Sequence, residues 1–79
     1  MEKTEILEKL NDIFKTILND MDLEISENTF FDDLDNWDSV IQMMIVASIE
    51  KEFDVKFKLM EIGTINSVKG YIDAIKTKI

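Results

Sequence analysis

The sequence contains no cysteine, histidine, arginine or proline, and only two glycines. Without cysteine it forms no disulfide bonds and no zinc–thiolate sites. Without histidine it lacks the commonest general base and metal ligand. All nine basic residues are lysines, so no planar guanidinium group is available to bind phosphate or carboxylate in two places. The scarcity of proline and glycine favours helices over a turn-rich all-β fold.

The net charge is −8, and this imbalance narrows the range of partners. Nucleic acids and anionic lipids both require a basic surface, so we expect neither as a ligand. Basic protein surfaces are favoured instead, because the charge speeds their encounter with the chain. The N-terminus is charged throughout and resembles no signal peptide, and the longest apolar stretch, residues 40–49, is too short to span a bilayer. We therefore expect a cytoplasmic protein.

At 79 residues the chain is expected to form one domain, residues 1–79, around a single core. Apolar residues at three- and four-residue spacing predict an amphipathic helix that is N-capped by Thr4 and ends near Leu18. The same reasoning predicts a second helix from Ser39, a short third one and a last one from Ser67. The prediction is an all-α, small four-helix bundle, with three main helices plus one short helix. The expected helices cover residues 4–18, 39–53, 59–65 and 67–79.

A long polar loop, residues 19–38, separates the first two helices. Loops of this length inside a small domain are uncommon and are often functional. Its apolar residues are expected to anchor it to the bundle: Leu23, Ile25, Phe30, Phe31 and Leu34. Apolar and charged residues alternate over residues 53–57, as they do in a β-strand. No other segment of the chain could pair with such a strand, so none is expected. The expected core includes Leu10, Phe14, Ile45, Ile49, Phe53 and Ile72.

The predicted helix 39–53 has two apolar arcs, and one helix of a small bundle cannot bury both. We assign the first arc to the core: Met43, Ile45, Val46, Ile49 and Phe53. The second arc has two interpretations: the loop covers it, or it docks a partner, for which adaptable methionine is suited. The second arc consists of Val40, Ile41, Met44 and Ala47.

Ser39 stands where the acidic loop meets this helix. It fits a capping box with Gln42, and Asp38 is an alternative N-cap. No neighbouring residue could activate its hydroxyl as a nucleophile, so we expect no catalytic residues and no enzyme activity. A second enzyme could still attach a group there, and a helix N-terminus would stabilise an attached phosphate.

The acidic residues of the loop raise the question of a calcium site. An EF-hand counted from Asp33 requires glycine at its sixth position and glutamate at its twelfth, where this sequence has Asp38 and Met44. We therefore expect no dedicated metal site.

The sequence resembles the acyl and peptidyl carrier proteins over nearly its whole length. The segment "FFDDLDNWDSV" is similar to the family's F-x-x-D-L … D-S-L signature. The helix "IQMMIVASIEKEFDVKF" and the segment "EIGTINSVKGYIDAI" resemble the family's second helix and its third and fourth helices. The spacing before Ser39 is one residue longer than in the D-L-G-x-D-S-L form and resembles a W-D-S variant of stand-alone carriers.

The resemblance implies a carrier function. In the family, the serine at the position of Ser39 bears 4′-phosphopantetheine, which a phosphopantetheinyl transferase takes from coenzyme A. The arm holds acyl or aminoacyl intermediates as thioesters. The implied partners are this transferase, an acyl- or aminoacyl-activating ligase and a downstream transferase or synthase, and we expect a monomer. The implied docking residues are Asp35, Asp38, Val40, Ile41, Met44 and Ile62.

One departure from the family pattern affects the expected partners. Ile41 and Met44 lie where carriers of fatty-acid synthesis place acidic residues. Docking by apolar contact is therefore expected, as in carriers that adenylating ligases load. The alternative hypothesis is an unmodified acidic helical interaction module in which Ser39 is only a cap.

Overall fold

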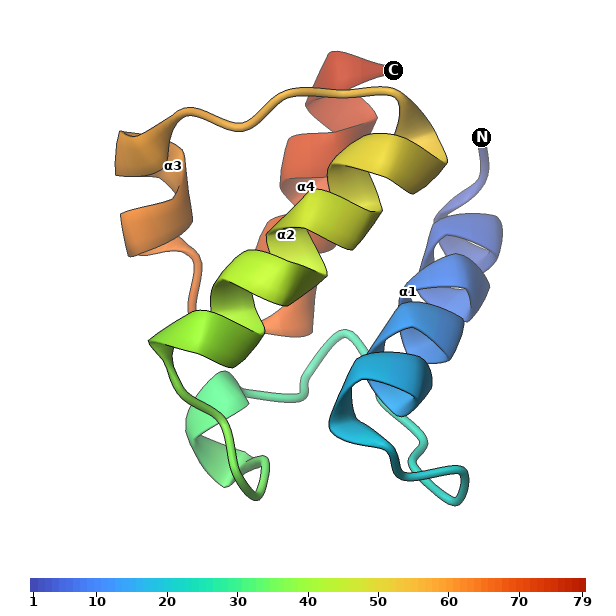
Figure 1. Ribbon diagram of the computed structural model, residues 1–79. Coiled ribbons are helices and arrows are strands. Elements are labelled where there is room, and N and C mark those ends of the chain that lie inside the picture. The colour runs from blue at the N-terminus through green and yellow to red at the C-terminus, as the bar shows by residue number, and fades with distance from the viewer.

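Four α-helices form the protein, and the computed structural model describes all of residues 1–79 (Figure 1). No sheet is present, and the one β-type contact is an isolated antiparallel bridge between Phe30 and Ser67. The all-α prediction, with three long helices and one short helix, is confirmed. None of the helices combines the length and the apolar character that a membrane span requires. The helices are α1 (Lys3–Leu18), α2 (Ser39–Phe53), α3 (Leu59–Thr64) and α4 (Val68–Lys78).

Helix α1 begins earlier than the sequence predicts. Its N-cap is Glu2 rather than Thr4, and the backbone N–H of Glu2 donates to the side chain of Glu5 at 3.4 Å. The predicted cap at Thr4 is wrong. Glu5, the third residue of the helix, reaches back with its side chain to the backbone N–H of Glu2, so the helix is capped two residues earlier. The helix ends at Asn19, which adopts the left-handed conformation that asparagine tolerates at helix ends.

The core is entirely apolar, with fifteen buried residues and no buried charged group. All six core residues predicted from the sequence are among them. Met43, which we assigned to the core arc, is 47% exposed, so that assignment is wrong. Ile45, Val46 and Ile49 form the middle of the face of α2 that packs into the core. At about 100° per residue, Met43 lies at the margin of that face. The arc that α2 buries is therefore narrower than the predicted one.

An aromatic cluster lies at the centre of this core. The ring of Phe31 is 6.2 Å from that of Phe14 and 5.2 Å from that of Tyr71, measured between centroids. The hydroxyl of Tyr71 is buried without a hydrogen-bond partner. Burial raises the pKa of this hydroxyl well above its usual value, so Tyr71 stays neutral. The cluster joins α1, α4 and the connection between α1 and α2.

That connection, residues 19–38, contains a 3-10 turn, η1 (Phe31–Asp33). Of its expected anchors, Ile25 and Phe31 are buried, and Leu23 and Leu34 pack partly against the core. Phe30 is 51% exposed, so its predicted anchoring role is wrong. Phe30 is the extended residue before η1 and Phe31 is the first residue of η1, and of the two rings only that of Phe31 faces the core.

Backbone hydrogen bonds tie the same connection to the start of α4. The N–H of Phe31 donates to the carbonyl of Asn66 at 3.0 Å, and the N–H of Val68 donates to the carbonyl of Thr29 at 3.0 Å. Nearer its start, the N–H of Ile25 donates to the side-chain oxygen of Asn11 in α1 at 2.7 Å. The loop is thus attached to the helices at several points before it reaches α2.

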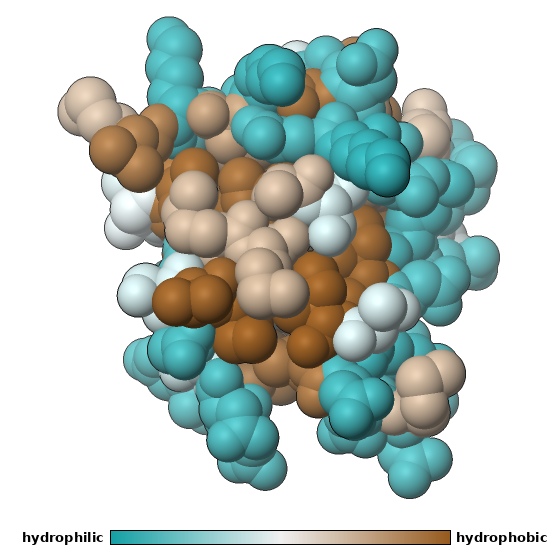
Figure 2. Space-filling model, viewed as in Figure 1, coloured by the Kyte–Doolittle hydropathy of each residue, from teal (hydrophilic) through white to brown (hydrophobic).

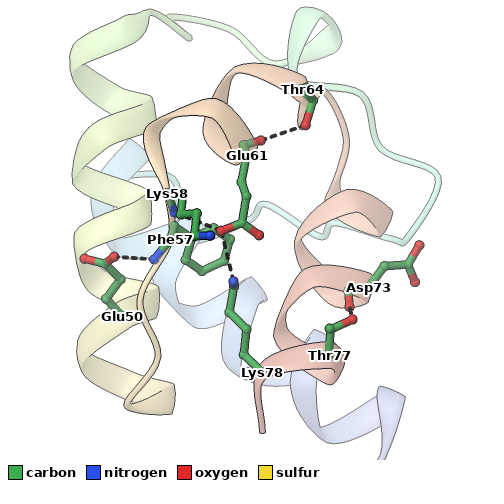
Figure 3. Close-up of polar contacts among 8 residues, drawn as sticks. All are labelled: Glu50, Phe57, Lys58, Glu61, Thr64, Asp73, Thr77 and Lys78. Atoms are coloured by element: carbon green, nitrogen blue, oxygen red, sulfur yellow. Dashed lines mark hydrogen bonds and ion pairs between the residues drawn. The ribbon is translucent and has the colours of Figure 1, made fainter.

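Polar contacts hold the short helix α3 in place (Figure 3). The carboxylate of Glu61 accepts a hydrogen bond from the backbone N–H of Lys58 at 2.8 Å and an ion pair from Lys78 of α4 at 2.9 Å. These donors hold the pKa of Glu61 below its usual range. Just before α3, the N–H of Phe57 donates to Glu50 of α2 at 2.8 Å. Helix α3 is therefore linked to both α2 and α4.

Replacing Ile49 by alanine tests the assignment of the buried face of α2. Ile49 is fully buried, so we expect Ile49→Ala to lower the free energy of unfolding by about 2–5 kcal/mol. The matched control is Val40→Ala on the opposite face, which is 66% exposed and should change stability by less than about 0.5 kcal/mol. Urea titration of both variants measures the difference, and equal losses would contradict the assigned face.

Candidate functional site

The site is built at the junction between the acidic connection and α2. Asp38 is the N-cap: its backbone is extended and its carboxylate oxygen Oδ1 accepts a hydrogen bond from the N–H of Ile41 at 2.8 Å. Its carbonyl also accepts the N–H of Gln42 at 2.9 Å. Ser39 follows as the first residue of the helix, and its side chain is exposed.

The capping box predicted for Ser39 and Gln42 is wrong. The side-chain amide of Gln42 donates instead to the carbonyl of Ile62 in α3, at 3.2 Å. The Ser39 hydroxyl takes part in no hydrogen bond, because the carboxylate of Asp38 occupies the capping position and makes a charge-assisted bond there. Asp38 therefore caps the helix in place of Ser39, and the hydroxyl of Ser39 is left without a hydrogen bond.

Trp37 is the part of this junction that the sequence analysis missed. Its ring stacks on Phe31 with a centroid distance of 4.4 Å and on Phe14 at 5.7 Å. It is partly buried against the core. The signal was present in the sequence, since a lone tryptophan in a polar loop close to an aromatic pair commonly packs on that pair.

Beyond Ser39, most of the second arc of α2 is open to solvent, and Met43 from the edge of the first arc is exposed beside it. Val40 is 66% exposed and Met43 and Met44 are each 47% exposed. With Ser39 and Ala47 these residues line a shallow depression. Figure 2 shows apolar surface gathered over α2 and hydrophilic surface around it. The interpretation in which residues 19–38 cover this arc is wrong, because Val40 and Met44 remain exposed. We call Val40, Met43, Met44 and Ala47 the apolar strip.

Two of the expected docking residues lie elsewhere than predicted. Ile41 is only partly exposed and packs against the core, since it stands at the margin between the two faces of α2. Ile62 is buried, with 8% exposure, so its side chain offers no docking surface. Ile62 is the one residue of α3 whose side chain is buried in the core. The exposed apolar residues of α3 are Leu59 (78%) and Met60 (86%).

Acidic residues surround the junction on its loop side. Asp35 and Asp38 are both exposed. No group of three or more acidic side chains is close enough together to hold a metal ion. The connection contains no lysine, and its acidic residues are Asp20, Asp22, Glu24, Glu27, Asp32, Asp33, Asp35 and Asp38.

Comparison with known proteins gives two similarities and one negative result. Residues 4–75 match the family model described as the phosphopantetheine attachment site. Among solved structures, the chain is similar to the holo acyl carrier protein from Geobacter metallireducens. The two share 29% sequence identity with a TM-score of 0.84, over 92% of this chain and 84% of that one. No curated protein matches the chain.

The capping geometry predicts opposite outcomes for two adjacent alanine substitutions. Asp38→Ala removes the cap and should lower the free energy of unfolding by about 0.5–2 kcal/mol. Ser39→Ala removes an exposed hydroxyl without a hydrogen bond and should stay within about 0.5 kcal/mol of the unsubstituted protein. Thermal and urea denaturation of the two variants compare them directly. A larger loss for Ser39→Ala would assign the cap to Ser39 after all.

Proposed function

The chain belongs to the phosphopantetheine-attachment family of carrier proteins, and from that premise we propose that Ser39 bears its arm. Carriers of this family are not enzymes, and 4′-phosphopantetheine is attached to them covalently. One observation carries the assignment to Ser39: its hydroxyl is exposed and free of hydrogen bonds at the first position of α2, because Asp38 provides the cap.

The surroundings of Ser39 fit a phosphodiester. The first N–H groups of an α-helix have no acceptor within the helix, and together with the helix dipole they favour an attached anion. In α2 the Asp38 carboxylate already occupies the N–H of Ile41, which leaves the N–H groups of Ser39 and Val40 nearest to a phosphate on Oγ. The exposed side chain leaves room for the rest of the arm on the solvent side.

The chemistry at Ser39 is a substitution at phosphorus. The Oγ of Ser39 forms a bond to the β-phosphorus of coenzyme A, the pyrophosphate bond breaks, and 3′,5′-adenosine bisphosphate leaves. A separate transferase removes the proton from the hydroxyl, because the chain has no histidine and places no lysine at the junction. Once attached, the arm supplies a thiol that holds a carboxylic acid as a thioester. The chain's own contribution is to hold the hydroxyl at a fixed, accessible point.

We further propose that the apolar strip docks the ligase that loads the arm. An enzyme that reaches a group on Ser39 has to approach α2, and the strip starts at the next residue, Val40. No charged residue lies between Ser39 and Ile49, so the contact made there is apolar. Leu59 and Met60 of α3 extend the same kind of surface and replace Ile62 in the proposed docking set.

The acidic connection has a separate part in docking. Its charges lie on the loop side of Ser39, while the strip itself is uncharged. Long-range attraction to a basic partner raises the rate of association, whereas contact with an apolar surface sets the rate of dissociation. We propose that Asp35 and Asp38 steer the partner and that the strip holds it.

An unmodified interaction module is the second candidate function. The exposure of the apolar strip favours it independently, because such a surface would bind a partner whether or not Ser39 is modified. The two functions differ in a simple way: only a carrier gains the mass of the arm.

Modification of Ser39 gives the direct test. Incubation with coenzyme A and a broad-specificity phosphopantetheinyl transferase should add one arm per chain, measured as intact mass. Ser39→Ala should abolish the gain, and the control Ser48→Ala, in the same helix, should keep it. If Ser39→Ala still gains the arm, the assigned residue is wrong. If the unsubstituted chain never gains it with several transferases, the interaction module becomes the better description.

The docking role of the strip is tested at Met44. Met44→Glu should leave stability within about 0.5 kcal/mol, since the side chain is half exposed. It should lower kcat/KM for loading of the modified protein about tenfold, because a charge buried without a partner at an apolar contact is costly. The matched control is Met21→Glu, at a methionine that is 73% exposed and lies outside the strip. Unimpaired loading by the Met44 variant, or an equal effect of the control, would contradict the docking role.

A further inference from the structure

We propose that Trp37 is a positioning residue for the transfer of the arm to Ser39. It would act through the backbone of the loop–helix junction, by holding the hydroxyl where the transferase can use it. The inference rests on the proposed function, since it assumes that Ser39 is the residue modified. What it adds is a side chain that controls the reaction without being the acceptor.

The segment that leads to Ser39 has almost no other attachment. The last backbone hydrogen bonds of the connection are donated by Asp33 and Leu34 within η1. Asp35 and Asn36 form a turn. No backbone hydrogen bond of standard geometry starts or ends at residues 35–37, and the side chains of Asp35 and Asn36 make none. Asn36 adopts a left-handed conformation, with φ of 65°, which turns the chain toward α2. Hydrogen bonds therefore do not fix this segment.

Trp37 provides the missing attachment. Its ring lies nearly parallel to those of Phe31 and Phe14, with interplanar angles of 18° and 22°. Both partners are buried, with exposures of 3% and 0%. The other aromatic pairs of the cluster are tilted by 36° or more. The indole is thus stacked on rings that the core itself holds in place.

The short distance along the chain makes this attachment effective at Ser39. Consecutive Cα atoms are about 3.8 Å apart, so Trp37 and Ser39 are separated by no more than about 7 Å. Trp37 fixes the chain on one side of Asp38, and the cap from Asp38 to Ile41 fixes it on the other. Between these two points the backbone of Ser39 is held in place relative to the surface that a transferase meets, and this fixes the point from which its side chain extends.

Loss of the stack should therefore affect the reaction more than the fold. Helix α2 should keep the cap from Asp38 and its buried face, since neither of them includes the indole. The junction, however, would be free to move, and the attacking oxygen would spend less time in line with the phosphorus. A misplacement of about 1 Å can lower the rate of a reaction about 100-fold.

The experiment compares Trp37→Leu and Trp37→Met, which keep apolar volume but lack a ring, with Trp37→Phe, which keeps one. Transfer from coenzyme A by one transferase is followed at varied concentrations of each carrier variant, so that kcat and KM are separated. We expect kcat to fall about 10- to 100-fold for leucine and methionine and to recover largely with phenylalanine. Circular dichroism checks that the helices are retained, and methionine serves if the leucine variant does not fold.

Ile75→Val in α4 is the control for a general loss of stability, since Ile75 is fully buried and remote in sequence from the junction. It should show normal kcat even where its melting temperature is lowered as much as that of a Trp37 variant. The inference is overturned if the leucine and methionine variants keep the kcat of the unsubstituted chain, or if the control loses kcat equally. A rise in KM alone would also overturn it, because Trp37 would then be a contact of the transferase. Failure of the unsubstituted chain to gain the arm would instead reject Ser39 as the acceptor.

Discussion

The packing of Phe31 against both Phe14 and Tyr71 is the interaction on which the arrangement of the site depends. The connection between α1 and α2 is long, polar and strongly acidic, and it contains no lysine of its own, so its charges repel one another except where Lys3 of α1 pairs with Glu27. A chain of that composition adopts a fixed path only if apolar anchors hold it. Phe31 is the central anchor, since it is buried at 3% exposure and forms the surface on which Trp37 stacks. The path of the chain into Ser39 follows from that contact.

Helix α2 contributes a second constraint, because it has more apolar residues than the bundle can bury. One face packs on α1 and into the core through Ile45, Ile49 and Phe53, and the other is left in water. Exposure of Val40, Met43 and Met44 offers no benefit to the folded chain in isolation. Their exposure has a function if another protein covers these residues during part of the functional cycle. The same helix thus stabilises the fold with one face and provides a contact surface with the other.

Much of this could be predicted from the sequence, because local patterns determine it. The bounds of α2, the start of α4 within one residue of Ser67 and the main core residues all follow from helical spacing. The errors concern choices between neighbours that only tertiary packing makes. Phe31 rather than Phe30 enters the core, and Met43 lies at the edge of a face whose width depends on where α1 and α4 sit.

In the site, too, local sequence patterns predict some features, and others depend on tertiary packing. The exposed position of Ser39 at the start of α2 was predictable, and Asp38 was one of the two caps that the sequence allowed, but spacing alone could not choose between them. Gln42, the expected capping-box partner of Ser39, is drawn instead to the carbonyl of Ile62, twenty residues away in the chain. Sequence spacing alone also could not show that Ile62 faces inward, since a six-residue helix has too few turns to define a face. The bond from Gln42 has a consequence for the surface as a whole. By joining the first turns of α2 to α3, it fixes Leu59 and Met60 relative to the apolar strip. A partner that contacts both helices therefore meets a surface whose shape is set before it binds, which lowers the entropy that association would otherwise cost.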